Sequence, residues 1–513
     1  MGEHPRSISA FPLGRIRIVM RKLSLFTAVL AAGAFAATGA HAQKDSITLS
    51  MALEPPHLDP VLSPAAAIKE IMYTNIYEGL TRLDRKSLVQ PGLATEWSLS
   101  ADGLVYTFKL RRGVKFHDGT ELTSAAVAQS LARTTSAESA NPKKTMLTDN
   151  GMEVQTPDPG TVVIRLKKPV GLVPYLVGMG EAVVVAPGAI ADAKAKPVGT
   201  GPFKFVRWNK GDRLEIEKNP DHWNAANIKL NKATFRFIPD AAATVAALLA
   251  GDIDASPNTG AGDALDRLKA DPKLKVVVGN TEGETILAMN NKKAPLDDVR
   301  VRRAISHAID RKAIIIGAAG GTATPIGTHF SPNHPAYVDL TGMYPFDPAK
   351  AKALLAEAGK TNLTLSLRLP PPAYAQRGGE LIAAMLEQVG VKAQIEQLQF
   401  PQWLEQVFKN KQYDLTIISH TEPLDINIYA DPNYYFQYGK PEFKALIDLT
   451  VSAGTDEIRN KAFGDAQRML ATDAVNGFLF MLPKTGVWNA KIQGLWENSP
   501  VQANDLTEVR WVN

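Results

Sequence analysis

GLVYTFKLRRGVKF, residues 103–116, alternates apolar and more polar side chains with a period of two. The apolar positions are Leu104, Tyr106, Phe108 and Leu110. In an extended chain these side chains share one face, which predicts a β-strand with one buried face. A strand of this kind is stable only when further strands or helices cover that face. The covering elements must come from the rest of the chain.

Helix signals alternate with the strand signals along the chain. In FDPAKAKALLAEAG (346–359), Asp347 can cap the first free amides, and Gly359 can end the helix. DAAATVAALLAGDIDA (240–255) repeats this plan, and ELIAAMLEQVGVKAQIEQL (380–398) predicts a helix followed by a strand. The alternation predicts an α/β fold, and a chain of 513 residues should form two or three domains.

The N-terminus has the pattern of a secretory signal peptide. Residues 20–42, MRKLSLFTAVLAAGAFAATGAHA, begin with a basic pair, continue with an apolar run and end in small residues. This pattern predicts cleavage between Ala42 and Gln43 and export to the periplasm. The run is too short and too rich in alanine for a good membrane span. Residues 1–19 resemble an upstream extension, with Met20 as the more natural start.

Most of the chain's excess of basic over acidic residues lies in residues 1–42, which we call the leader. The whole chain has 57 Lys and Arg against 52 Asp and Glu, whereas the chain after residue 42 has 52 against 51. A net charge near +1 gives no reason to expect nucleic acid or an anionic membrane as a partner. Because the sequence has no cysteine, disulfides, thiolate metal sites and cysteine nucleophiles are excluded.

The sequence has no clear signature of catalysis or of a cofactor. GTGPF (199–203) lacks the Lys-Ser/Thr of a phosphate loop, and GAAGGTATPIG (317–327) lacks a following basic residue. No G-x-S-x-G is present, and the seven histidines after the leader have no metal-binding spacing. We therefore predict a binding protein without cofactor, resident metal or enzymatic activity. A secreted hydrolase on a similar scaffold is the alternative.

Six segments, in the same order, resemble the extracellular solute-binding proteins of family 5, which are peptide- and nickel-type receptors of ABC importers. The segments are EPPHLDP (54–60), NIYEGLTRLD (75–84), PGLATEWSLSADGLVYTFKLRRGVKFHDGTELTSAAV (91–127), VGTGPFKFVRWNKGDRLEIEKNPDHWN (198–224), MNNKKAPLDDVRVRRAISHAID (289–310) and DPAKAKALLAEAG (347–359). The resemblance implies two α/β lobes of the periplasmic-binding-protein fold, with a small inserted third domain. The lobes would close on a ligand and deliver it to a permease in the inner membrane.

The resemblance also implies domain limits and a hinge. The first lobe would comprise residues 43–88, 198–288 and 485–513, the inserted domain residues 89–197, and the second lobe residues 289–484. The hinge is expected near residues 198–203 and 483–490. Gly199 and Gly201, next to Pro202, would absorb the backbone rotation.

The segment HTEPLDINIYADPNYYFQY (420–438) is the candidate ligand-binding segment. It contains four of the chain's 12 tyrosines together with the acidic residues Glu422, Asp425 and Asp431. In the family's peptide receptors this segment supplies an Asp that holds the peptide α-amino group. That position is Pro423 here, and it is flanked by Glu422 and Asp425. Either acid could bind a cationic group, or could merely cap a turn.

Other positions follow from the resemblance. Glu54 matches an acid that borders the cleft, and His420 replaces a Trp of the relatives. Arg377 could hold a carboxylate bidentately at a helix start, or could be an ordinary surface arginine. The complete predicted ligand set is Glu54, Tyr374, Arg377, His420, Thr421, Glu422, Asp425 and Tyr429. We expect most of the tyrosines to pack against the lobe and one or two to face the cleft.

These side chains suit a small molecule with an amine at one end and a carboxylate or a ring elsewhere. A small peptide or an amino-acid conjugate such as an opine meets that description. An oligosaccharide, or a nickel chelate with His420 as its one protein ligand, are the alternatives. The predicted partners are the ligand and an ABC permease, and the protein is expected to be a monomer. A chemoreceptor-coupled sensor would have the same fold.

Overall fold

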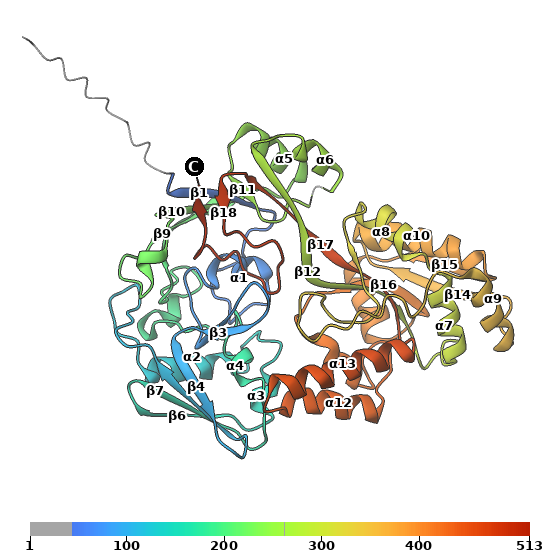
Figure 1. The fold of residues 1–513 in the computed structure, drawn as a ribbon, viewed down its shortest axis with the longest axis horizontal. Coiled ribbons are helices and arrows are strands. Elements are labelled where there is room, and N and C mark those ends of the chain that lie inside the picture. The colour runs from blue at the N-terminus through green and yellow to red at the C-terminus, as the bar shows by residue number, and fades with distance from the viewer. Residues whose placement is uncertain (1–43, 261, 513) are drawn as a thin grey trace, which may run out of the picture. The chain divides into compact units, whose positions relative to one another are not determined.

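One large mixed sheet runs through most of the chain. The computed structural model describes residues 44–260 and 262–512, and in it eleven strands form this sheet. The strand order is β15-β14-β16-β12-β17-β11-β1-β10-β9-β8, and β13 pairs with β17 beside this path. Helices separate most of the strands (Figure 1), so the predicted α/β fold is confirmed.

The first lobe contains one end of the large sheet and the helices around it. Its elements are β1 (Ser46–Met51), α1 (Ala66–Met72), β2 (Thr81–Leu83), β3 (Val89–Pro91), β8 (Phe203–Asn209), β9 (Arg213–Lys218), η2 (Ala225–Asn227), β10 (Lys232–Phe237), α5 (Ala241–Ala250), β11 (Ala255–Ser256), η3 (Gly262–Ala264), α6 (Leu265–Lys269), β18 (Ile492–Gln493) and β19 (Arg510–Trp511). A core of aliphatic and aromatic side chains joins β1, β9 and β10 to α1 and to the C-terminal segment. Asp240 caps α5 as predicted, because its Oδ1 accepts the Ala243 amide at 2.7 Å.

The inserted domain is built on a separate four-stranded antiparallel sheet. Its elements are β4 (Ala94–Leu99), β5 (Val105–Leu110), α2 (Ser124–Thr134), α3 (Thr145–Thr148), β6 (Glu153–Asp158), β7 (Thr161–Arg165), α4 (Val173–Leu176) and η1 (Pro187–Asp192), with the strand order β4-β5-β7-β6. Tyr106, Phe108 and Leu110 of β5 are buried in its core. The strand predicted from the alternating pattern is therefore confirmed.

The second lobe contains the other end of the large sheet, with helices packed against it. Its elements are α7 (Val299–Ala308), α8 (Arg311–Ala319), β13 (Thr324–Pro325), α9 (Pro348–Glu357), β14 (Leu363–Leu369), α10 (Ala373–Glu387), β15 (Val391–Gln397), α11 (Phe400–Trp403), the π-helical turn η4 (Leu404–Lys409), β16 (Leu415–His420), η5 (Asp425–Ala430), α12 (Pro441–Ser452) and α13 (Asp456–Thr472). Asp347 accepts the Lys350 amide at 2.8 Å and so caps α9 as predicted. None of the described helices is long and apolar enough to cross a membrane.

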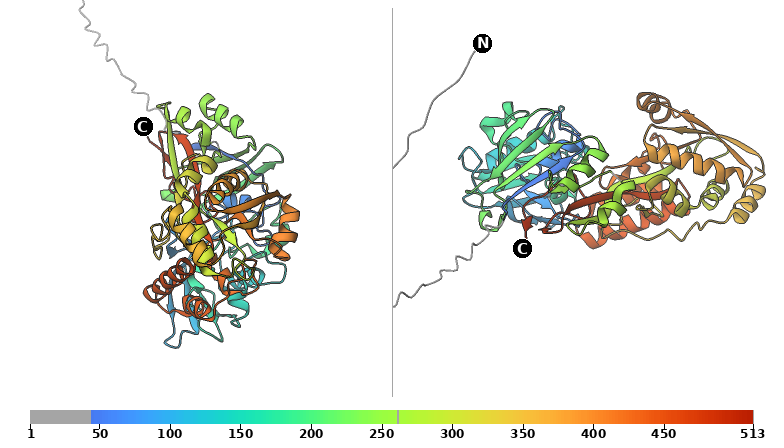
Figure 2. Two further views of the ribbon diagram at one scale, coloured as in Figure 1. Left: turned by 90° about the vertical axis from the view of Figure 1, so that its right-hand side faces the viewer. Right: turned by 90° about the horizontal axis from the view of Figure 1, so that it is seen from above.

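Two long strands link the lobes. β12 (Leu274–Met289) pairs antiparallel with β17 (Gly477–Asn489) along most of its length. Toward Leu274 the pair continues into the first lobe through β11, and toward Met289 it continues into the second lobe through β16. Figures 1 and 2 show both strands passing from one lobe to the other. The pairing is interrupted between Asn280 and Glu284, at the middle of this crossing.

The expected hinge at Gly199, Gly201 and Pro202 needs correction. The loop that contains them joins the inserted domain to the first lobe and does not run between the lobes. The Gly201 amide donates to the Ile76 carbonyl at 3.0 Å, and the Gly199 carbonyl accepts the His117 amide at 2.8 Å. Added Cβ atoms would lie 2.1 Å from the Ile76 oxygen at Gly199 and 2.4 Å from the Asn75 oxygen at Gly201. These glycines permit close backbone packing.

We predict that Gly199→Ala lowers the free energy of unfolding by about 1–3 kcal/mol, because the new methyl group meets a backbone carbonyl that cannot rotate away. Urea denaturation of the exported protein measures the change. Gly188→Ala is the matched control, since a Cβ at Gly188 meets nothing within 4 Å. Equal stability of the two variants would contradict the packing role.

Candidate ligand-binding site

The segment 420–438 is mostly core. Tyr429, Tyr435 and Phe436 are buried, and the rings of Tyr429 and Phe436 stack with their centroids 4.4 Å apart. The Tyr429 hydroxyl accepts from the Asn476 amide group at 2.9 Å. Tyr429 is therefore a structural residue, and its prediction as a ligand contact is wrong. The expectation that most of the tyrosines pack against the lobe is confirmed.

Asp425 is also buried, and two imidazoles bind it. His329 Nε2 donates to its Oδ1 at 2.8 Å, and His420 Nδ1 lies 3.3 Å from its Oδ2. Burial alone would raise the pKa of Asp425, but the two imidazoles, His329 foremost, hold that pKa well below its ordinary value. Asp425 and His420 thus satisfy each other, so Asp425 is not free to hold a ligand amine as predicted, and His420 is not free to contact the ligand as predicted.

The same three side chains have the composition of a metal site. Their candidate ligand atoms lie within 4.8 Å of one another. The second ring nitrogen of each histidine, however, already has a partner: Tyr429 donates to His329 Nδ1 at 3.2 Å, and Tyr435 lies 3.0 Å from His420 Nε2. A metal ion would have to displace these hydrogen bonds. The cluster is therefore complete as a hydrogen-bond network.

Two further acids of β12 lie near this network. Glu282 and Glu284 are both buried beside the interrupted pairing of β12 and β17. Burial raises the pKa of Glu282 to about 8, although Ser331 donates a hydrogen bond to it at 2.8 Å. Burial, and then the charge of Asp425, raise the pKa of Glu284 well above its ordinary value. Both carboxyl groups are therefore protonated where Asp425 is ionised.

Glu422 is the predicted acid that remains available. Its side chain is exposed, and it lines a cavity of about 70 Å³ between the lobes. The opposite wall comes from α1 and the inserted domain, and includes the buried ion pair of Lys69 with Glu181. This cavity is the candidate ligand-binding site, because it is the place where exposed charge of the second lobe meets the first lobe and the inserted domain.

Lys143 of the inserted domain also lines this cavity. Its ammonium group donates to the Leu424 carbonyl at 3.2 Å and to Asn427 Oδ1 at 3.3 Å, both in the second lobe. Burial lowers the pKa of Lys143, and the carboxylate of Asp425 and then that of Glu422 oppose this shift. Lys143 therefore brings a positive charge close to the acids of the second lobe.

The remaining predicted residues lie elsewhere or are not engaged. Glu54 accepts from Trp208 Nε1 at 2.8 Å and from the Gly211 amide at 2.9 Å, so it fixes the turn between β8 and β9. The Tyr374 hydroxyl accepts the Ser419 amide at 3.1 Å. These bonds give both residues a structural role.

Arg377 on α10 and Thr421 are exposed. Within the described chain Arg377 forms no hydrogen bond or ion pair, and its role in binding stays a prediction. The residues that sequence reasoning missed are Lys69, Lys143, Tyr175 and Glu181, which line the cavity from α1 and the inserted domain. They have no local signal, because only the fold brings them opposite Glu422.

Comparison with known proteins identifies the class. Residues 89–441 match the bacterial extracellular solute-binding proteins, family 5, and the chain belongs to this family. It is thus a solute-binding protein of the type that serves ABC importers, with the two-lobed fold and the inserted domain.

The chain is also similar to individual solute-binding proteins and to their solved structures. The chain is 32% identical to the glutathione-binding protein GsiB of Escherichia coli O1:K1, over 73% of this chain and 72% of that protein. The structure of AgaA from A. tumefaciens R10 in complex with agropinic acid is 25% identical, with a TM-score of 0.73 over 91% of this chain and 99% of that one. The unliganded open form of the murein tripeptide binding protein MppA is 22% identical, with a TM-score of 0.81 over 92% of this chain and 98% of that one.

We predict that Glu282 makes stability fall as pH rises. The folded protein keeps the Glu282 proton up to about pH 8, whereas the unfolded chain loses it near the ordinary value of 4.5. Its contribution is therefore fully present below pH 4.5 and is lost between these two values, by up to about 1.4 kcal/mol per pH unit.

Unfolding free energies of the wild type and of Glu282→Gln, measured by urea titration across that window, test this prediction. Glutamine can still accept the Ser331 hydrogen bond but does not titrate, so wild-type stability should fall relative to the variant as pH rises. Glu121→Gln, at an exposed site, should follow the wild type. A difference between wild type and Glu282→Gln that does not change with pH would contradict the prediction.

Proposed function

We propose that this protein is the periplasmic substrate-binding component of an ABC importer, and that it captures a small peptide or a related solute with an amine and a carboxylate. The cavity between the lobes carries this proposal, because Glu422 and Lys143 offer opposite charges there from different parts of the chain. The 32% identity to a glutathione-binding protein supports it, since glutathione is a peptide with one ammonium and two carboxylate groups.

The charges of the cavity favour this class of solute over the alternatives. Glu422 is free to accept from an ammonium group, while the ammonium group of Lys143 can shift from neutral oxygens of the second lobe to a ligand carboxylate. A charged hydrogen bond contributes roughly 1.5–3 kcal/mol. An uncharged oligosaccharide would use neither charge. His420, the one protein ligand predicted for a nickel chelate, has partners at both ring nitrogens.

The proposal includes the location of the protein and its partners. The signal-peptide pattern at residues 20–42 lies outside the described residues, and export with cleavage after Ala42 is part of what we propose. The ligand-bound protein would deliver its solute to a permease in the inner membrane, as a monomer that binds no nucleic acid. It would have no catalytic activity of its own.

The ligand prediction is tested by calorimetry with glutathione and a panel of dipeptides and tripeptides. We expect at least one of these ligands to bind, and Glu422→Gln to weaken its binding about tenfold or more, because the ammonium group loses a charged acceptor. Glu442→Gln, at an exposed site of α12 in the same lobe, is the matched control and should bind like the wild type.

Two results would contradict the proposal. One is binding only of uncharged sugars or of nickel chelates across a screen that includes them, with no peptide bound. The other is multiple-turnover cleavage of a bound peptide, which would make the protein a hydrolase.

We further propose that the lobes close about the interrupted part of the β12–β17 pair. Regular pairing stops at Asn280 and resumes at Glu284, and the Thr281 hydroxyl there donates to the Leu482 carbonyl at 2.9 Å. The chain superposes more closely on the unliganded open form of MppA than on the agropinic acid complex of AgaA, with TM-scores of 0.81 and 0.73. Both observations support an open structure with a local hinge.

Small-angle scattering tests this closure. The radius of gyration should decrease when the peptide found by calorimetry saturates the protein, because ligand contacts to both lobes stabilise the closed state. The Glu422→Gln variant at the same ligand concentration should show a smaller change. Superimposable curves of the wild type with and without ligand would contradict a hinge motion.

A further inference from the structure

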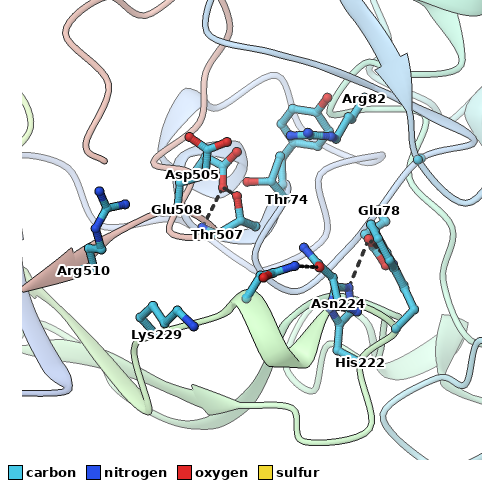
Figure 3. Close-up of a pocket in the computed structure, with 15 residues that line it drawn as sticks. Thr74, Glu78, Arg82, His222, Asn224, Lys229, Asp505, Thr507, Glu508 and Arg510 are labelled. Atoms are coloured by element: carbon cyan, nitrogen blue, oxygen red, sulfur yellow. Dashed lines mark hydrogen bonds and ion pairs between the residues drawn. The ribbon is translucent and has the colours of Figure 1, made fainter. Parts of the chain in front are cut away.

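The first lobe contains a second cavity, which the proposed transport function does not use. Its volume is about 440 Å³, and its walls come from the segment 73–79 that follows α1, from β2, from the segment 222–229 and from the C-terminal segment 505–510 (Figure 3). Tyr73 borders both this cavity and the cavity between the lobes. The two spaces are therefore neighbours, but no residue of the second lobe lines the cavity in the first lobe.

Thr74 supplies an unsatisfied group to this cavity. Its side-chain oxygen is buried and has no hydrogen-bond partner in the described chain, and the residue is only 6% exposed. Its φ of 66° lies in the left-handed region, which is rare for a β-branched residue. A buried hydroxyl without a partner is uncommon in folded proteins and indicates a missing partner.

Asp505 lies beside Thr74, and only one of its two carboxylate oxygens accepts hydrogen bonds within the described chain. Its Oδ1 accepts from the Thr507 amide at 2.9 Å and from the Thr507 hydroxyl, whereas no donor of the described chain reaches Oδ2. Burial raises the pKa of Asp505 above its ordinary value. A cation bound at Oδ2 would reverse this shift, since an opposite charge favours the ionised carboxylate.

Among residues 44–260 and 262–512, three basic side chains of the cavity have no acidic partner. Arg82 forms no side-chain hydrogen bond or ion pair within the described chain, and it lies on the same side of the cavity as Thr74 and Asp505 (Figure 3). Across the cavity, Lys229 donates to the Ala226 carbonyl at 2.9 Å and Arg510 donates to a neutral glutamine at 2.7 Å. The acid Glu508, by contrast, is already paired with Arg85.

We propose that this cavity is a second ligand site, for an acidic amino acid or a compound of the same chemistry. The α-ammonium group would bind between Asp505 Oδ2 and the Thr74 hydroxyl, and the α-carboxylate would bind the adjacent Arg82. The side-chain carboxylate would then extend across the cavity to Lys229 and Arg510.

The arrangement of charges selects this class of ligand. One free carboxylate oxygen adjoins one free guanidinium group, which matches the neighbouring ammonium and carboxylate of an α-amino acid. The cations on the far wall have no acid to pair with, which favours a second carboxylate on the ligand. An inorganic anion and a simple dicarboxylate both lack the ammonium group that would donate to Asp505 Oδ2 and to the Thr74 hydroxyl.

Fluorescence titration of the exported protein with L-glutamate tests the proposal. Trp223 lines the cavity and is 37% exposed, so binding should change its emission. The change should disappear in Trp223→Phe, while calorimetry still detects binding. Glutarate, which lacks the ammonium group, should bind about tenfold or more weakly.

Matched variants locate the site. Arg82→Met and Thr74→Val should each weaken L-glutamate binding, the first about tenfold or more, while Arg112→Met, at an exposed arginine outside the cavity, should not. Valine keeps the β-branched shape of threonine at this strained position. In the cleft variant Glu422→Gln, L-glutamate should still change the Trp223 emission as in the wild type, which separates this site from the proposed transport site.

Three results would overturn the proposal. The first is the absence of binding by L-glutamate and by L-aspartate in protein that is folded by circular dichroism. The second is equal binding of L-glutamate and glutarate. The third is L-glutamate binding that Arg82→Met leaves intact and Glu422→Gln abolishes.

Discussion

The antiparallel pairing of β12 with β17 is the constraint on which the rest of the structure depends. Each strand carries backbone hydrogen bonds into both lobes, so the two lobes share one sheet and cannot separate without breaking its ladder. The ladder is irregular between Asn280 and Glu284 and again between Thr285 and Ile286, and we propose that the sheet bends at the first of these places. The acids of the interruption, Glu282 and Glu284, are buried at the same point, and the electrostatics of the second lobe are therefore coupled to the geometry of the crossing.

Burial decides which charges of the second lobe can meet a ligand. Asp425 is ionised because His329 and His420 solvate it in place of water, and its neighbours on β12 stay protonated because no cation does the same for them. A negative charge already satisfied by two imidazoles has little left to offer a ligand. Glu422, three residues earlier in the chain, is exposed and has no such partners. In the function that we propose, selectivity of the cleft would therefore depend on Glu422 and on Lys143 opposite it.

The parts of the structure that the sequence predicted are those with local causes. The alternation around Tyr106 and the cap at Asp347 act within one element, and both are observed. The site depends on contacts between residues far apart, such as His329 with Asp425 at a separation of 96 and Lys143 with Asn427 at a separation of 284. No spacing rule covers such distances. The family resemblance pointed to Glu422 and Asp425 without deciding which of them faces the cleft, and burial distinguishes the two, because Asp425 is buried and Glu422 is exposed.

The structural role of a glycine is likewise not predictable from the sequence alone. A glycine next to a proline is compatible with a hinge and equally with close packing, and the sequence does not distinguish these two causes. At Gly199 the missing Cβ leaves room for the Ile76 carbonyl, so the residue permits close packing at the joint with the inserted domain. The inserted domain places Lys143 and Glu181 on the wall of the cavity between the lobes. In the closure that we propose, bending at the β12–β17 crossing would change the distance from Lys143 to Glu422 while Lys143 keeps its place relative to the first lobe.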